Sequence, residues 1–147
     1  MSRTSTRFPL AVHVLVALSY RPNDYLSSES LSGTVATNPV VVRRALALLG
    51  AAGLVTSQTG ASGGARLARS AERITLLDVY RAVEPGSVFC MHSPNPGCPI
   101  GRRIPEVLGS FLPAVEVAME DALARVTILD VARKVLPGYR PEPRRSA

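Results

Sequence analysis

The sequence is poor in the residues that mark several classes of protein. Its 147 residues include two cysteines, two histidines and no tryptophan. Two cysteines are too few for a disulfide scaffold and suit a reducing compartment. The apolar part of the uncharged stretch 45–65 ends at Val55, well short of a membrane crossing. The length suits one ordinary domain, or a small domain with one long helix, rather than a large multidomain enzyme.

A signal peptide is the main alternative to a cytoplasmic location. The apolar run 8–18 follows two arginines, and residues 17–19 resemble a small-residue cleavage site. His13 interrupts the run, and the apolar residues recur at the three- and four-residue spacing of a helix face. We therefore interpret residues 7–19 as a buried core helix with Thr6 at its cap, and expect a cytoplasmic protein.

Positive charge is concentrated in the N-terminal half, and only one of the seventeen basic residues is lysine. Residues 1–73 contain eight arginines and three acidic residues, a net charge of +5. Residues 74–136 have a net charge of −1, and residues 137–147 add +2. Arginine is the better bidentate partner for phosphate and guanine, so this distribution favours nucleic acid as a partner of the first half.

Helix-start signals predict two further helices in this half. Ser27 or Ser28 caps a short one. Asn38 at a cap position and Pro39 at the first helical position predict a helix over residues 40–52, beginning with free N–H groups that suit phosphate. One face of that helix carries Val42, Ala45, Leu46 and Leu49, and the other carries Val40, Arg43, Arg44 and Ala47.

Residues 54–69 predict a β-hairpin with a glycine-rich tip. Glycines at the tip remove side-chain bulk, so the backbone can approach a narrow DNA groove, and Arg66 and Arg69 can reach the minor groove or its phosphates. Helix, short helix, turn, Asn-Pro helix and hairpin follow one another in the order of a winged helix-turn-helix. Two adjacent arginines alone would favour a merely solvated helix face, but the hairpin and the charge favour DNA binding.

The C-terminal half predicts a long helix and a short one. Thr75 and Asp78 form a capping box for a helix that ends near Glu84. Residues 85–101, with four prolines, three glycines and both cysteines, read as an irregular loop. An amphipathic helix follows, in which Pro113 is expected to cause a kink. Thr127 and Asp130 cap a last short helix.

The long helix is too apolar on one side to stay in water, so we expect a symmetric dimer. The expected interface residues are Leu108, Phe111, Leu112, Val115, Met119 and Leu123. The predicted fold is mainly α with a small β-hairpin wing. It divides into a winged helix-turn-helix (1–84), a cysteine-containing loop (85–101), a dimerisation helix with a C-terminal helix (102–136), and a disordered basic tail (137–147).

Several segments resemble one bacterial family in order and spacing. They are Thr37–Arg44, Ala52–Val55, Gly60–Gly64, Leu67–Arg69 and Ile74–Val83. They resemble the Rrf2 (BadM/Rrf-type) family of winged-helix transcription regulators, and His92–Gly101 narrows the resemblance to its YwnA-type branch. The resemblance implies a homodimer joined through the long helix. With the residue pattern, it gives a DNA face of Ser27, Ser28, Thr37, Asn38, Pro39, Val40, Arg43, Arg44, Gly63, Gly64, Arg66 and Arg69.

The cysteine loop departs from the family pattern. The best-known members hold an iron–sulfur cluster on three closely spaced cysteines, whereas this loop has only Cys90 and Cys98. Two soft ligands per chain are poor for iron–sulfur or structural zinc, so we expect neither a cofactor nor a metal. Cys98 is either a small buried hydrophobe or a sensing thiol favoured by the nearby Arg102 and Arg103, with Cys90 as a resolving thiol.

An enzymatic reading has no basis in the sequence. The segment Gly60–Gly64 lacks the Lys-Ser/Thr of a nucleotide-binding loop, and neither histidine has an evident catalytic partner. We therefore predict a dimeric repressor that binds a palindromic operator in double-stranded DNA and is modulated by thiol redox or electrophile chemistry in the 85–101 loop. The alternatives are a winged-helix protein-interaction or scaffold module, or a regulator that responds to a small molecule without thiol chemistry.

Overall fold

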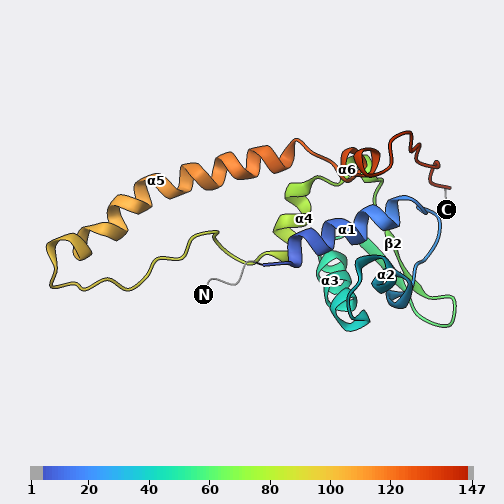
Figure 1. Cartoon of the computed structure of the whole chain (residues 1–147), viewed down its shortest axis with the longest axis horizontal. Coiled ribbons are helices and arrows are strands. Elements are labelled where there is room, and N and C mark those ends of the chain that lie inside the picture. Colours follow the sequence, from blue (N-terminus) through green and yellow to red (C-terminus); the bar gives the residue numbers. More distant parts are fainter. Residues whose placement is uncertain (1–4, 146–147) are drawn as a thin grey trace.

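The first helix of the chain, α1, is surrounded by other helices (Figure 1). The computed structural model describes residues 5–145; Arg3, part of the sequence resembling an export signal, and residues 146–147 of the expected tail lie outside the described residues. The elements are α1 (Arg7–Ser19), α2 (Ser28–Val35), α3 (Pro39–Ala51), β1 (Val55–Gln58), β2 (Gly64–Leu67), the 3-10 turn η1 (Ala71–Arg73), α4 (Leu76–Val83), α5 (Pro99–Ala124) and α6 (Ile128–Val135). This mainly helical chain with one two-stranded antiparallel hairpin confirms the predicted fold class.

Most helix starts follow from local cap chemistry. Ser27 Oγ accepts the Ser30 N–H at 3.1 Å, and Asn38 Oδ1 accepts the Val40 N–H at 2.8 Å. The capping boxes that begin α4 and α6 are both formed. Thr6 is an exception, because it stands at the cap position of α1 without a side-chain hydrogen bond. The Arg7 N–H donates instead to the Ser5 hydroxyl at 3.3 Å.

Helix α1 forms the centre of the core and packs against α2, α3, α4 and α6. In Figure 1, α4 and α6 lie above α1, and α2 and α3 lie below it. The largest fully buried side chains are Leu15, Leu18, Leu31, Leu49, Leu54, Leu67, Ile74 and Ile128. His13, by contrast, is on the exposed side of α1 and lies 3.3 Å from the Thr34 hydroxyl. Helices α1 to α4 therefore pack into one unit.

Helix α6 belongs to this packed unit rather than to the long helix. Thr75 and Thr127 form an antiparallel bridge, in which Leu76 N–H donates to Val126 O and Ile128 N–H donates to Ile74 O, both at 2.8 Å. Ile128, Leu129 and Ala132 of α6 join the core. The C-terminal helix, which the division along the sequence places in one segment with the dimerisation helix, thus packs on the domain, because the bridge returns the chain to it.

Helix α5 projects away from the domain (Figure 1). It begins at Pro99, earlier than expected, and continues through Pro105 and Pro113 to Ala124. Its contacts with the domain include the ion pair between Arg81 and Glu120 at 2.8 Å. Every residue of α5 is exposed or half-buried. Within residues 5–145, no helix is long and apolar enough to span a membrane.

The C-terminal tail, expected to be disordered, lies against the domain up to residue 145. The Tyr139 ring packs edge-on against Tyr20, with ring centroids 4.3 Å apart, and its hydroxyl donates to the Ser19 carbonyl. Burial raises the pKa of Tyr139. Composition predicted disorder because the segment is rich in proline and arginine, but a single aromatic side chain anchors it to α1.

Candidate nucleic-acid interface

A groove on the domain surface joins the start of α2, the outer face of α3 and the hairpin. We call it the α3–wing groove; it encloses about 580 Å³. It is lined by Ser27, Ser28, Glu29, Arg43, Leu46, Ala47, Gly50, Ser57, Gln58, Gly60, Ala61, Gly63 and Gly64. Five residues expected on the DNA face thus meet in one concavity, although they come from three separate segments of the chain.

Arg43 is the cationic side chain of this groove. Its guanidinium lies 3.4 Å from the Glu29 carboxylate, and both side chains are more than half exposed. Exposed ion pairs contribute little to stability, so a phosphate or a guanine edge can replace Glu29 at small cost. Glu29 was missed in the sequence because it lies on α2, fourteen residues from Arg43.

The start of α3 is exposed but its first amide is already paired. Asn38 is exposed, Thr37 and Pro39 are half-buried, and Val40 keeps 43% of its surface exposed. The expectation of free N–H groups for phosphate is wrong at Val40, because the Asn38 side chain accepts that N–H. The apolar Val40 side chain remains available to contact a thymine methyl group.

Arg44 does not line the α3–wing groove. It lines a separate cleft of about 180 Å³ with Arg7, Leu10 and Val83, between α1, α3 and α4. Consecutive helical residues point about 100° apart, so Arg43 and Arg44 face different surroundings. The sequence grouped them on one face because both lie outside the buried stripe.

The wing glycines serve the fold itself. A Cβ on Gly64 would lie 2.3 Å from the Leu26 carbonyl oxygen, and one on Gly63 would lie 2.4 Å from that of Gln58. Leu26 pairs with Ala65 across this contact, with N–H···O distances of 2.9 and 2.8 Å. The reason for these glycines is therefore close packing of the chain on itself. Gly60, at φ +103°, occupies the turn and faces open space.

The two wing arginines are both engaged within the chain. The Arg66 guanidinium lies over the Tyr25 ring, 4.6 Å from its centroid, and its buried Nε has no hydrogen-bond partner among the described residues. Arg69 lies 3.9 Å from the capping carboxylate of Asp78. Neither lines the α3–wing groove. A stacking partner such as Tyr25 leaves no local signal in the sequence.

The two cysteines differ in their surroundings. Cys90 is exposed in the loop, and Cys98 is half-buried at the cap position of α5. Hydrogen bonds from the Gly101 and Ile100 N–H groups lower the pKa of Cys98. Cys98 therefore lies at a helix N-terminus, which favours the thiolate.

Helix α5 carries an apolar stripe beside the face that contacts the domain. Phe111 is 65% and Val115 50% exposed, and Leu108, Leu112, Met119 and Leu123 are half-buried. At about 100° per residue, Glu116 and Glu120 lie roughly a quarter turn from the centre of this stripe. These two glutamates make the contacts with Ser87, Val88 and Arg81.

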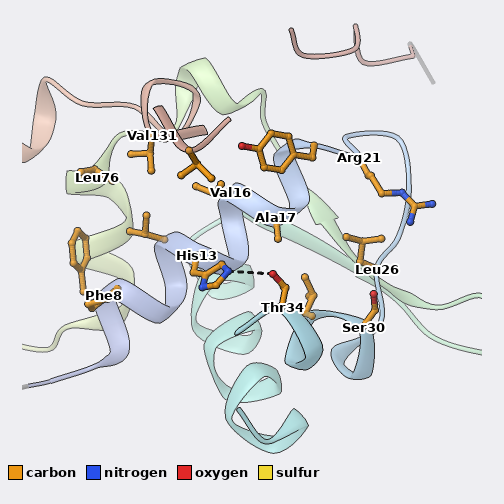
Figure 2. A pocket seen from close by; sticks show the side chains of 15 residues that line it. Phe8, His13, Val16, Ala17, Arg21, Leu26, Ser30, Thr34, Leu76 and Val131 are labelled. Carbon is orange, nitrogen blue, oxygen red and sulfur yellow. Dashed lines mark hydrogen bonds between the residues drawn. The ribbon is translucent and has the colours of Figure 1, made fainter. Parts of the chain in front are cut away.

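A second, apolar groove runs beside α1 (Figure 2). It encloses about 700 Å³ and is lined mainly by apolar side chains of α1, α2, α4 and α6. Figure 2 shows His13 and Thr34 as a hydrogen-bonded polar pair within it. We call it the α1 groove.

Helices α1, α2 and α3 are followed by a hairpin, and the outer face of α3 forms one groove with this hairpin. This arrangement defines a winged-helix DNA-binding module. The Rrf2 family model, described as "Iron-dependent Transcriptional regulator", matches residues 4–134. The chain therefore belongs to the Rrf2 family of transcriptional regulators, which are not enzymes.

Related sequences and structures agree with this assignment. The chain is 40% identical over 129 residues to the "Putative HTH-type transcriptional regulator YwnA" of Bacillus subtilis (strain 168), covering 86% of this chain and 95% of that protein. A solved "putative DNA binding protein" shares 38% identity with a TM-score of 0.71, over 86% of this chain and 98% of that one. T. potens IscR, at 22% identity and a TM-score of 0.70, covers 96% and 93% and shows the same fold.

The family's description names iron, but the side chains here do not fit an iron site. Residues 5–145 contain no cluster of three or more His, Cys, Asp or Glu side chains that could hold a metal ion. The chain has only two thiols, those of Cys90 and Cys98.

Proposed function

We propose that the protein is a homodimeric repressor that binds a palindromic operator through the α3–wing groove. The observation that carries this proposal is the convergence of Ser27, Ser28, Arg43 and the wing on one concave surface. Arg43 and the exposed start of α3 would read bases in the major groove, while Ser27 and Ser28 contact phosphates. Arg44, Arg66 and Arg69 would contact the DNA backbone beside the groove. Since its partner is chromosomal DNA, we place the protein in the cytoplasm.

The α5 stripe supports the dimer. An apolar stripe with exposed side chains such as Phe111 and Val115 is covered by the same stripe of a second copy in a two-fold arrangement. Two domains held this way place two α3 helices about one DNA turn apart, or a multiple of it, which accounts for a palindromic operator.

The test begins with selection of an operator from a random duplex library by the purified protein. Fluorescence anisotropy then compares wild type with Arg43→Ala on the selected and a scrambled duplex. Loss of a base contact should cost about 1–3 kcal/mol on the operator alone. Val135→Ala, a substitution at an exposed position of α6, is the control. Equal binding of Arg43→Ala and wild type at every salt concentration would remove the groove from the interface and favour the scaffold alternative.

We further propose that the 85–101 loop senses oxidants. The lowered pKa of Cys98 favours its thiolate, which attacks a peroxide to give sulfenic acid and hydroxide. The Cys90 thiol then condenses with the sulfenic acid, forming a disulfide and releasing water. Because the loop joins the domain to α5, this bond changes the spacing of the two domains in the dimer.

An operator gel shift with and without hydrogen peroxide tests the thiol chemistry. Wild type should be released, Cys98→Ser should not respond, and Cys90→Ser should stop at sulfenic acid, which dimedone labelling detects. Release that persists in the Cys90→Ser/Cys98→Ser double variant would exclude thiol sensing.

The α1 groove favours a second candidate, regulation by a small apolar molecule. Its volume lies within the range of ligand sites, about 300–1,000 Å³, and His13 with Thr34 supplies the polar group that orients a ligand. A ligand there would contact α2, which borders the α3–wing groove. Titration with anilinonaphthalene sulfonate tests access: wild-type dimer should enhance its fluorescence and Ala17→Trp should not. Absence of binding to wild type would exclude this candidate.

A further inference from the structure

The outer edge of strand β2 is only partly paired. Its inner edge pairs with β1, and its outer edge meets Leu26 at Ala65. In an antiparallel strand, residues two apart direct their backbone groups to the same edge. The Leu67 carbonyl therefore faces the outer edge beyond Leu26, at the root of the wing.

Arg144 of the C-terminal tail occupies this position. Its Nη2 donates to the Leu67 carbonyl at 2.9 Å, and its Nη1 donates to the Ala68 carbonyl at 3.0 Å. A guanidinium has two parallel donors in a rigid fork, which match two carbonyls in a way that one ammonium group cannot. Hydrogen bonds with a charged donor are about twice as strong as neutral ones.

The tail is held on both sides of Arg144 by other contacts. Asn23 Nδ2 donates to the Pro143 carbonyl at 3.3 Å, and Asn23 Oδ1 accepts the Arg145 N–H at 2.9 Å. Tyr139 is anchored on α1 as described above. These other contacts therefore hold the segment beside the wing, and Arg144 does not have to order that segment itself.

The same segment reaches the outer face of the wing. Glu142 and Arg145 line a polar pocket of about 610 Å³ together with Arg66, Arg21 and Asp24. The tail thus contacts the wing at its root and lies beside its stacked arginine. These residues come after residue 134, where the match to the family model ends.

We propose that residues 137–145 form a strap that fixes the orientation of the wing, with Arg144 as a positioning residue for DNA binding. This inference rests on the proposed DNA-binding function. The wing is a two-stranded hairpin, and such hairpins are marginally stable alone. By covering the free edge at Leu67 and Ala68, Arg144 reduces the range of wing positions, so less freedom is lost when DNA binds.

Three variants of the full chain test the strap: Arg144→Gln, Arg144→Lys, and Arg145→Gln as a matched loss of charge next to it. Anisotropy measures operator affinity between 50 and 200 mM salt, and hydrogen exchange follows the amides of residues 55–67. Arg144→Gln should weaken binding by about fivefold and speed exchange in the wing, with an unchanged salt slope. Arg144→Lys should stay weakened, because it keeps the charge but loses the fork.

Several results would overturn the strap. One is a salt slope that falls by about 0.9 in Arg144→Gln, which would make Arg144 a phosphate contact. Full affinity in Arg144→Lys, or unchanged affinity and exchange in Arg144→Gln, would also overturn it. Equal effects of Arg144→Gln and Arg145→Gln would indicate charge alone. Arg43→Ala is measured in parallel to distinguish failure of the strap from failure of the proposed DNA face. If Arg43→Ala also binds like wild type, the proposed DNA face has failed and not the strap alone.

Discussion

The winged-helix domain and helix α5 differ in where their apolar side chains find partners. In the domain, α1 is surrounded by four helices, and Leu15 and Ile128 are among the side chains that are fully buried. In α5, 26 residues long, the apolar stripe stays open, and Phe111 exposes 65% of its surface. The domain is therefore complete within one chain, whereas no residue of α5 is buried in that chain.

Phe111→Glu should give the largest effect, since it places a charge on the most exposed side chain of the stripe. We expect monomers, and loss of operator affinity by about 100-fold or more, because two linked sites bind far more tightly than one. The domain should keep its melting temperature. Sedimentation, anisotropy and thermal unfolding measure the three quantities.

Val117→Glu is the matched control for Phe111→Glu. It adds the same charge on the same helix at a residue that is 58% exposed and lies about half a turn from the stripe. It should leave the dimer intact. A dimer that survives Phe111→Glu but is lost in Val117→Glu would place the interface on the other side of α5.

Ile128→Ala tests whether α6 belongs to the domain. Truncation of a fully buried isoleucine should lower the free energy of unfolding by about 2–5 kcal/mol. Urea unfolding is measured in the Phe111→Glu background, so that dimerisation does not contribute. Val135→Ala, at an exposed position of the same helix, should change it by less than about 0.5 kcal/mol. If Ile128→Ala changes the free energy of unfolding as little as Val135→Ala does, α6 is not part of the core.

Asn38→Ala and Thr6→Ala compare two cap positions within the domain. Asn38 bonds the Val40 N–H, so its loss should cost about 1 kcal/mol of unfolding free energy. Thr6 makes no side-chain cap bond among the described residues, so its loss should cost close to nothing. A larger cost for Thr6→Ala in urea unfolding would contradict this difference.

Asp130 should give the smallest effect, visible only in acid. Hydrogen bonds from Thr127 lower its pKa below the ordinary value near 3.9. A lowered folded-state pKa means that the carboxylate stabilises the domain above about pH 4, and that this contribution is lost as the pH falls through the folded pKa. Asp130→Asn should reduce the loss of stability between about pH 5 and pH 2. If the free energy of unfolding, measured in urea, falls equally in Asp130→Asn and wild type over this pH range, then Asp130 does not contribute to the acid sensitivity.

Sequence reasoning succeeded where the physical cause is local. Ser27, Asn38 and the Thr75 and Thr127 capping boxes were predicted because each cap bonds an amide two or three residues away. The exposed stripe of α5 was likewise readable from periodicity.

The sequence could not predict pairings between distant segments. Tyr139 meets Tyr20, and Arg144 meets Leu67, across separations of 119 and 77 residues. Gly64 was assigned to DNA approach, whereas its lack of a side chain accommodates Leu26. Such causes depend on the completed fold and leave no local pattern.

The bridge between Thr75 and Thr127 also sets the order in which the chain can fold. The core lacks Ile128, Leu129 and Ala132 until α6 has been synthesised, and α6 follows α5 in the chain. A nascent chain therefore presents the apolar α5 before its own domain is closed. Closing the core requires contacts between residues about 110 apart, which slows folding relative to local helix formation. During synthesis, the surface proposed for association is therefore complete before the core of the domain.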